Sequence, residues 1–164
     1  MAGKKIGNNF CNIKVIPQYT IMPHIHNQVF GCVLEFQDIN ESRYLVVKGR
    51  KSGKYSFPKG HPNPNEDPYD CALRELMEET GLVPPRIPLR IHQLATGLYY
   101  HYRVSEELIG CPEDTEEVED IQWLSAAELR RLPINVDVST FLKRIQRKPT
   151  VMLQQPWRTA QVSV

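Results

Sequence analysis

The sequence predicts an α+β domain built from short strands and two helical regions. Runs of alternating or continuous apolar residues indicate strands on both sides of one strongly amphipathic helix. A second helical region follows the last predicted strand, so strands and helices alternate along the chain. With 164 residues and 41% apolar content, the chain is long enough for one sizeable core.

The predicted strands are short and are separated by polar or proline-containing segments. We expect the first two to form a pair joined by the polar turn 37–42. The predicted strands cover residues 29–36, 43–48, 55–57, 89–95, 98–104 and 120–124.

The first helix is predicted at 68–80, directly after a stiff loop at 61–65 that its prolines keep out of the helical conformation. Asp67 is a suitable N-cap, and Pro68 fits the first turn. Gly81 suits the left-handed position that ends a helix, and the two prolines that follow shortly prevent continuation.

Two further helices are predicted near the end of the chain. Ser125 and Glu128 have the spacing of a capping box, which opens a short helix. The periodicity of residues 136–146 predicts a longer one.

The first helix carries three glutamates on one face. Glu75, Glu78 and Glu79 have the spacing i, i+3 and i+4, which brings them together at about 100° of rotation per residue. The expected core side of the helix is apolar: Leu73, Leu76 and Met77. Like charges at this spacing repel one another, so the cluster needs a cation. Mg²⁺ or Mn²⁺ is the simplest candidate, because both prefer oxygen ligands.

The surroundings of these glutamates form a longer motif. Gly60 is followed after five residues by Glu66, and after seven more by the segment RELMEETGL at 74–82. The chain therefore resembles the Nudix hydrolase family, whose box reads G-x5-E-x7-R-E-U-x-E-E-x-G-U, where U is apolar. The resemblance implies an α/β/α sandwich with a mixed sheet and the hydrolysis of a diphosphate linkage.

The resemblance also implies roles for residues of the box. Glu78 and Glu79 are the expected main metal ligands, and Glu75 is a further ligand or an orienting carboxylate. The backbone carbonyl of Lys59 or Gly60 is expected to complete the coordination sphere. These residues are the expected metal site, for Mg²⁺ or Mn²⁺.

Two more side chains are expected to assist catalysis. The planar guanidinium of Arg74 can hold Glu75 or Glu66 in place through a forked contact. Family members often add a carboxylate from a distant loop, and the acidic segment 113–120 offers candidates. We favour Glu117 as ligand or general base, with Glu116 next.

Charge is distributed unevenly, although the net charge is only +1. Residues 1–60 and 129–164 are each strongly basic, and residues 61–128 are strongly acidic. A basic segment that includes Lys51 precedes the box, and another lies near the C-terminus at Lys143, Arg144 and Arg147. Both segments are compatible with phosphate binding or with an ordinary solvated surface. The expected substrate-binding residues are Lys48, Arg50, Lys54, Lys59 and Tyr100, of which Tyr100 could stack on a base.

The substrate is less sharply predicted than the chemistry. The segment YSFPKG at 55–60 resembles the entry to the box in Nudix branches that act on messenger RNA caps, dinucleoside polyphosphates and diphosphoinositol polyphosphates. Decapping of capped RNA is the leading hypothesis, with diadenosine tetraphosphate or diphosphoinositol polyphosphate as alternatives. A non-catalytic module that binds nucleotide or RNA is the alternative of another class.

The expected organisation is an N-terminal extension at 1–24, a Nudix hydrolase domain at 25–146 and a C-terminal tail at 147–164. No apolar run of 18 residues and no signal peptide is present, so we expect no membrane association and a cytoplasmic, or also nuclear, protein. The four cysteines lack metal-binding spacing, so reduced thiols are expected. The oligomeric state is left open.

Overall fold

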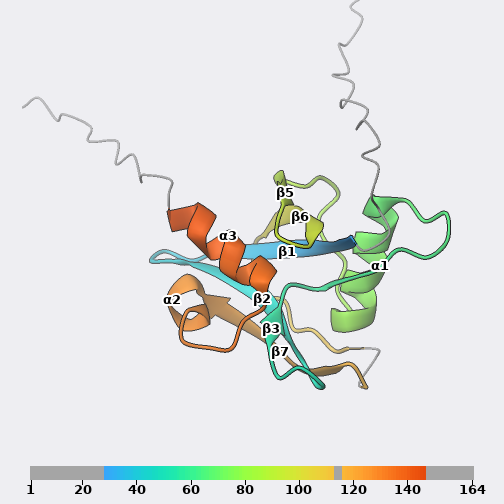
Figure 1. The fold of residues 1–164 in the computed structure, drawn as a ribbon. Helices are drawn as coiled ribbons and strands as arrows, with labels where there is room; N and C mark the ends of the chain where they lie inside the picture. The colour runs from blue at the N-terminus through green and yellow to red at the C-terminus, as the bar shows by residue number, and fades with distance from the viewer. Residues whose placement is uncertain (1–27, 113–115, 147–164) are drawn as a thin grey trace, which may run out of the picture.

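A computed structural model describes residues 28–112 and 116–146 of the chain (Figure 1). The predicted extension at 1–24, the predicted tail at 147–164, which includes Arg147, and part of the acidic segment lie outside these residues.

The observed elements agree closely with the predicted ones. All six predicted strands are confirmed, with ends that differ by at most two residues, and so are the three predicted helices. The strands are β1 Val29–Gln37, β2 Ser42–Gly49, β3 Tyr55–Ser56, β4 Lys59–Gly60, β5 Arg90–Gln93, β6 Gly97–Val104 and β7 Val118–Ser125. The helices are α1 Pro68–Thr80, α2 Ala126–Leu129 and α3 Val136–Gln146.

One strand, β4, was not predicted. It has two residues and follows Pro58, so it carries no periodic pattern that could mark it in the sequence. It pairs with β1 through Phe30 opposite Gly60 and Gly31 opposite Lys59. This pairing places the beginning of the box against the sheet.

The sheet is mixed, as the family resemblance implied. Its central path runs β3-β2-β1-β6-β5, while β4 pairs with β1 and β7 pairs with β2. The pair β1–β6 is parallel, whereas β1–β2, β2–β7 and β5–β6 are antiparallel.

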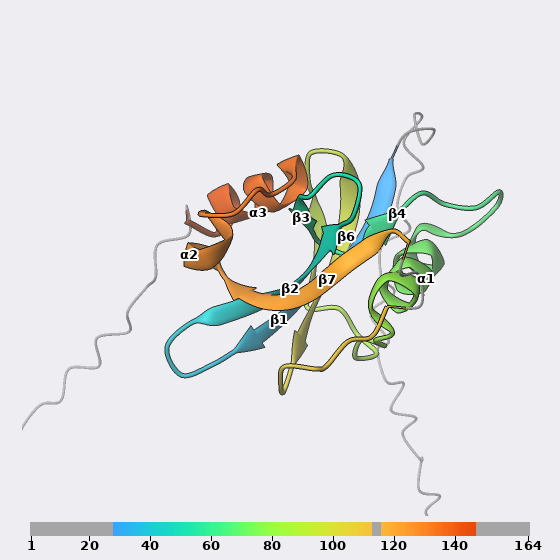
Figure 2. The same cartoon turned by 90° about the horizontal axis from the view of Figure 1, so that it is seen from below.

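Helices cover both faces of the sheet, which makes an α/β/α sandwich. Viewed from below, α2 and α3 lie on one side of the strands and α1 on the other (Figure 2). Phe141 and Leu142 of α3 pack with Val33 and Val46 in one core cluster. The second cluster joins the apolar side of α1 to the opposite sheet face: Phe30, Cys32, Leu34, Leu45, Cys71, Ala72 and Leu76.

The ends of α1 are set by local chemistry, as predicted. The side chain of Asp67 accepts a hydrogen bond from the backbone N–H of Tyr69, at 2.8 Å. At the other end Gly81 has φ 67°, a left-handed conformation that glycine adopts without a steric penalty. Ser125 and Glu128 likewise form the predicted capping box of α2.

In the described part of the chain, no helix combines the length and apolarity needed to span a membrane. Cys32, Cys71 and Cys111 are free thiols, whereas Cys11 lies outside the described residues.

Candidate active site

The acidic face of α1 packs against β4 rather than standing free in solvent. Glu79 accepts a hydrogen bond from the backbone N–H of Lys59, at 3.0 Å, and is partly buried there. Burial raises the pKa of Glu79 to about 7. The Glu75 side chain is 13% exposed and its pKa is also raised by burial, whereas Glu78 is 46% exposed. The predicted division of α1 into a core side and an acidic side is therefore too simple.

A glycine is required where Glu75 meets β4. A Cβ atom at Gly60 would overlap the carboxylate of Glu75. The carbonyl of Gly60 faces the same helix, since the thiol of Cys71 lies 3.9 Å from it. The first residue of the box thus allows α1 to approach β4 closely enough to hold Glu75.

Arg74 holds the glutamates in place through the predicted forked contact. Its Nε and Nη2 donate to the two carboxylate oxygens of Glu66, at 2.7 and 2.9 Å. Its Nη1 donates to Glu75 at 2.7 Å and to Glu78 at 2.9 Å. The hydrogen bonds from Arg74 lower the pKa of Glu66 to about 2. One guanidinium therefore ties the loop before α1 to the acidic face.

Glu79 and Glu117 share a cleft of about 230 Å³, although 38 positions separate them in the sequence. The negative charge of Glu117 contributes to the raised pKa of Glu79, after the larger effect of burial. The residues that line the cleft are Val47, Gly49, Lys51, Ser52, Ser56, Lys59, Glu79, Glu117 and Val118. Lys51 belongs to the predicted basic segment, whereas Ser52 and Ser56 were not predicted, because they belong to no motif.

A β-bulge shapes this wall of the cleft. Lys48 pairs with Asp120, but the next residue, Gly49, pairs with Val118, so Glu119 is an extra residue in β7. Val118 consequently lines the cleft, while Glu119 forms an ion pair with Lys48 at 3.1 Å. The backbone N–H of Arg50, in the turn after β2, donates to the carbonyl of Glu117 at 2.9 Å. This hydrogen bond holds the segment just before β7 against that turn.

Two predicted substrate-binding residues need correction. Lys48 lies on the sheet face opposite the cleft, because side chains alternate along β2 and its neighbour Val47 lines the cleft. Tyr100 is 8% exposed and packs edge-on against Tyr69, with ring centroids 5.0 Å apart, so its ring is a core group rather than a stacking platform. Both faces of β6 are covered by helices, which the alternation of its aromatic residues did not reveal.

The other three predicted substrate-binding residues lie closer to the cleft. Lys59 lines it, whereas Arg50 and Lys54 are exposed in the adjoining turn and do not line it.

The site has the donor chemistry for a hard divalent cation. Glu75 and Glu79 offer carboxylate oxygens. Burial, and to a smaller extent repulsion from Glu75, raise the pKa of Glu79, although the positive charge of Lys59 acts in the opposite direction. Within residues 28–112 and 116–146, however, no three acidic, histidine or cysteine side chains form a ready metal-binding group. Arg74 instead occupies oxygens of Glu75 and Glu78.

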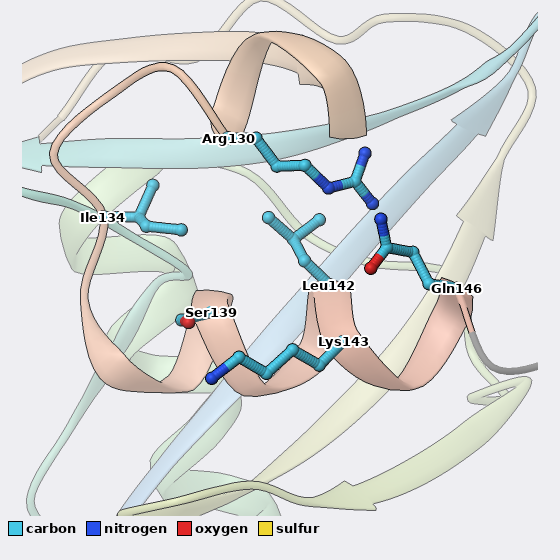
Figure 3. Close-up of a pocket in the computed structure, with 6 residues that line it drawn as sticks. All are labelled: Arg130, Ile134, Ser139, Leu142, Lys143 and Gln146. Atoms are coloured by element: carbon cyan, nitrogen blue, oxygen red, sulfur yellow. The ribbon is translucent and has the colours of Figure 1, made fainter.

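A larger cavity, of about 300 Å³, lies between α2 and α3 (Figure 3). Its lining residues are Arg130, Ile134, Ser139, Leu142, Lys143 and Gln146. None of them is a carboxylate or an imidazole, so this cavity lacks a group that could activate water. The smaller cleft at Glu79 is therefore the better candidate active site.

Comparison with known proteins identifies the family of the chain. Residues 26–145 match the NUDIX domain family. The chain is 32% identical over 93 residues to the mRNA-decapping enzyme subunit 2 of Arabidopsis thaliana, covering 52% of this chain and 25% of that protein. It is 31% identical over 98 residues to the NAD-capped RNA hydrolase NudC of Pseudomonas fluorescens, covering 56% and 34%. The chain thus spans about a quarter to a third of the length of these relatives.

A shorter relative and a solved structure match over more of their own length. The phosphatase NudJ of Escherichia coli is 30% identical over 117 residues, which cover 65% of this chain and 71% of NudJ. A Caenorhabditis elegans Ap4A hydrolase complex has the same fold, with a TM-score of 0.60 at 16% identity, covering 73% of this chain and 96% of that one. The family model, which matches residues 26–145, shows that the chain belongs to the Nudix family, and the solved structure shows the same fold.

Proposed function

We propose that this Nudix hydrolase cleaves a diphosphate linkage at the 5′ end of capped RNA. The observation that carries the proposal is the cleft in which Glu79 and Glu117 lie beside Lys51 and Lys59. Carboxylates are suited to activating water and lysines to binding phosphate oxygens. Two relatives, the decapping subunit and NudC, are named for hydrolysis of capped RNA, which favours RNA over a free nucleotide.

The cation we propose is Mg²⁺ or Mn²⁺, in line with the general use of divalent metals by the family. Glu78 and Glu79 would be its main ligands and Glu75 a further one, although Arg74 contacts both Glu75 and Glu78 in this structure. A backbone carbonyl of Lys59 or Gly60 would supply a further oxygen. When bound, the cation neutralises negative charge that develops on the phosphate oxygens.

The protein's own residues supply the other parts of the reaction. A water oxygen attacks one phosphorus of the bridge, and the bond from that phosphorus to the bridging oxygen breaks. The electron pair of that bond leaves with the neighbouring phosphate. Glu117 accepts the proton of the attacking water, with Glu116 as the alternative base, and Lys59 stabilises the leaving phosphate. Arg74 keeps Glu75 in place throughout.

We propose that Lys143 of α3 and Arg130, which follows α2, contact RNA beyond the cap. Lys143 and Arg130 line the cavity between α2 and α3 without an acidic neighbour in its lining (Figure 3). Arg144 is engaged differently, because it donates to the backbone carbonyl of Gln93. RNA cleavage should therefore weaken with salt more steeply than cleavage of a cap dinucleotide, and the double variant Lys143→Gln with Arg130→Gln should flatten that salt dependence.

The test is product analysis with capped RNA, free cap dinucleotide, diadenosine tetraphosphate and a diphosphoinositol polyphosphate, each with Mg²⁺ or Mn²⁺. We expect the highest kcat/KM on capped RNA, with the RNA released bearing a 5′ phosphate and no turnover in chelator. Equal or higher kcat/KM on a small substrate would contradict the RNA assignment. Binding of RNA without turnover of any substrate would indicate the non-catalytic alternative.

A further inference from the structure

The cleft at Glu79 is lined by charged and small residues rather than by aromatic ones. The residues that line it are lysines, serines, valines, glutamates and one glycine. Its volume of about 230 Å³ lies below the roughly 300 Å³ at which small-molecule sites usually begin, and such sites are mostly lined by apolar and aromatic groups. The cleft therefore suits a phosphate chain better than a nucleoside.

The aromatic residues nearest the site are turned into the two cores. Tyr99 and Phe57 are fully buried, and Tyr100 packs under α1. The indole of Trp123 is partly buried and donates to the carbonyl of Leu108. Phe36, Tyr69 and Trp123 are partly exposed, but among residues 28–112 and 116–146 no phenylalanine, tyrosine or tryptophan lines the cleft. Within the described part of the chain, a base that reaches the cleft therefore meets no aromatic side chain in its lining.

The lack of an aromatic residue in the lining affects how the base of a cap could be recognised. Proteins usually hold single bases by stacking them on aromatic side chains. The positive charge of a methylated guanine is recognised in the same way, through cation–π contact with an aromatic face. Lysine contacts to phosphate oxygens, by contrast, carry no information about the base.

The cationic side chains come from two separate elements. Lys51 lies in the turn after β2, and Lys59 lies in β4 beside Glu79. The hydroxyls of Ser52 and Ser56 lie in the same lining and add hydrogen-bond donors. Lys54, three residues after Lys51, is exposed outside the lining.

We propose that the cleft selects its substrate through the polyphosphate bridge and leaves the terminal base unread. Resting on the proposed RNA-end hydrolysis, this assigns the enzyme to RNA 5′ ends that share a di- or triphosphate bridge, whatever base the bridge carries. Ends capped by methylated guanosine, by unmethylated guanosine and by an adenosine are then substrates of similar quality.

The experiment uses one RNA sequence with three triphosphate-bridged caps that differ only in the base: 7-methylguanine, guanine and adenine. We expect kcat/KM values on the three to agree within tenfold. A preference of more than tenfold for one base overturns the inference while leaving the hydrolase function intact. Cleavage of none of the three, in the presence of Mg²⁺ or Mn²⁺, refutes the proposed function itself.

A pair of variants tests the role of the lysine directly. Lys51→Gln should lower kcat/KM by about tenfold on all three RNAs alike, because it removes a phosphate contact. Arg86→Gln is the control, because Arg86 is an exposed cation that does not line the cleft, and it should leave all three values unchanged. A loss in Lys51→Gln that is confined to one base, or an equal loss in both variants, would contradict phosphate reading by the cleft.

Discussion

Two glutamates on opposite faces of the sheet show how the neighbours of a buried carboxyl group set the direction in which its pKa changes. Glu79, on the α1 side, is desolvated beside other carboxylates, and its pKa rises to about 7. Glu35 of β1, on the α3 side, is 6% exposed, yet its pKa falls to about 2. Burial favours the neutral carboxyl in both places, so the neighbours decide the outcome.

Three polar side chains surround the carboxylate of Glu35. The imidazole Nε2 of His101 lies 3.1 Å from it, the hydroxyl of Ser42 donates at 2.6 Å, and Arg103 donates at 3.3 Å. Glu79 has one backbone donor, from Lys59. Donors and positive charge thus surround Glu35 on the α3 side. On the α1 side the carboxylates outnumber the cations, as in a site that binds a metal ion.

The largest expected effect comes from neutralising Glu79. Glu79→Gln should lower kcat by roughly 10³-fold, because it removes an anionic group from the reaction site. Its free energy of unfolding should stay level or rise, since a poorly compensated buried charge is removed. Steady-state kinetics and urea unfolding measure the two quantities, and activity within a few-fold of the parent would refute the assignment.

The second test concerns the far wall of the cleft. Glu117→Gln should lower kcat by about 10²-fold, in the range expected for loss of a general base. Glu116→Gln tests the alternative base in the same loop; because Glu116 does not line the cleft, it should cost less than threefold. Equal losses in the two variants would show that the assisting carboxylate lies elsewhere.

Acid titration tests the α3 side. The pKa of Glu35 is lowered, so the unfolded chain binds more protons than the folded protein between about pH 4.5 and pH 2. The stabilisation is present above pH 4.5 and is lost as the pH falls toward 2. We expect a loss on the order of 2–3 kcal/mol over this range, at about 1.4 kcal/mol per pKa unit.

Variants identify the group responsible for that loss. The Glu35→Gln variant should have a lower free energy of unfolding than the parent at neutral pH. Between pH 4.5 and 2.5 its free energy of unfolding should fall much less than that of the parent. Glu41→Gln, an exposed residue in the neighbouring turn, is the control and should retain the fall of the parent. Chemical unfolding at pH 2.5 to 7 measures both, and an unchanged pH profile in Glu35→Gln would assign the loss to other carboxyls.

The smallest expected effect comes from Arg74→Lys. Lysine keeps the charge but lacks the planar fork that holds Glu66 and Glu75 together, so kcat/KM should fall by about tenfold with the fold retained. Far-UV circular dichroism checks the fold. Unchanged kinetics would mean that the carboxylates are positioned by β4 alone.

Much of this arrangement was predictable from local sequence. The bounds of α1 agreed residue for residue, because Asp67 and Gly81 act on the backbone beside them. The contacts of Arg74 depend on the short separation between Glu66 and Glu78 along the loop and helix. Interactions within about a dozen positions depend on spacing, and spacing can be read in the sequence.

The tertiary structure decided the rest. Glu117 meets Glu79 only because β7 pairs with β2, and the bulge at Glu119 determines which side chains of β7 line the cleft. Lys48 and Tyr100 were misplaced for the same reason, since a strand's pattern shows that its side chains alternate but not what covers each face. The sequence by itself determined the family chemistry and the helix that carries it. Strand pairing and its register, which depend on contacts between distant segments, determined which charges share the cleft.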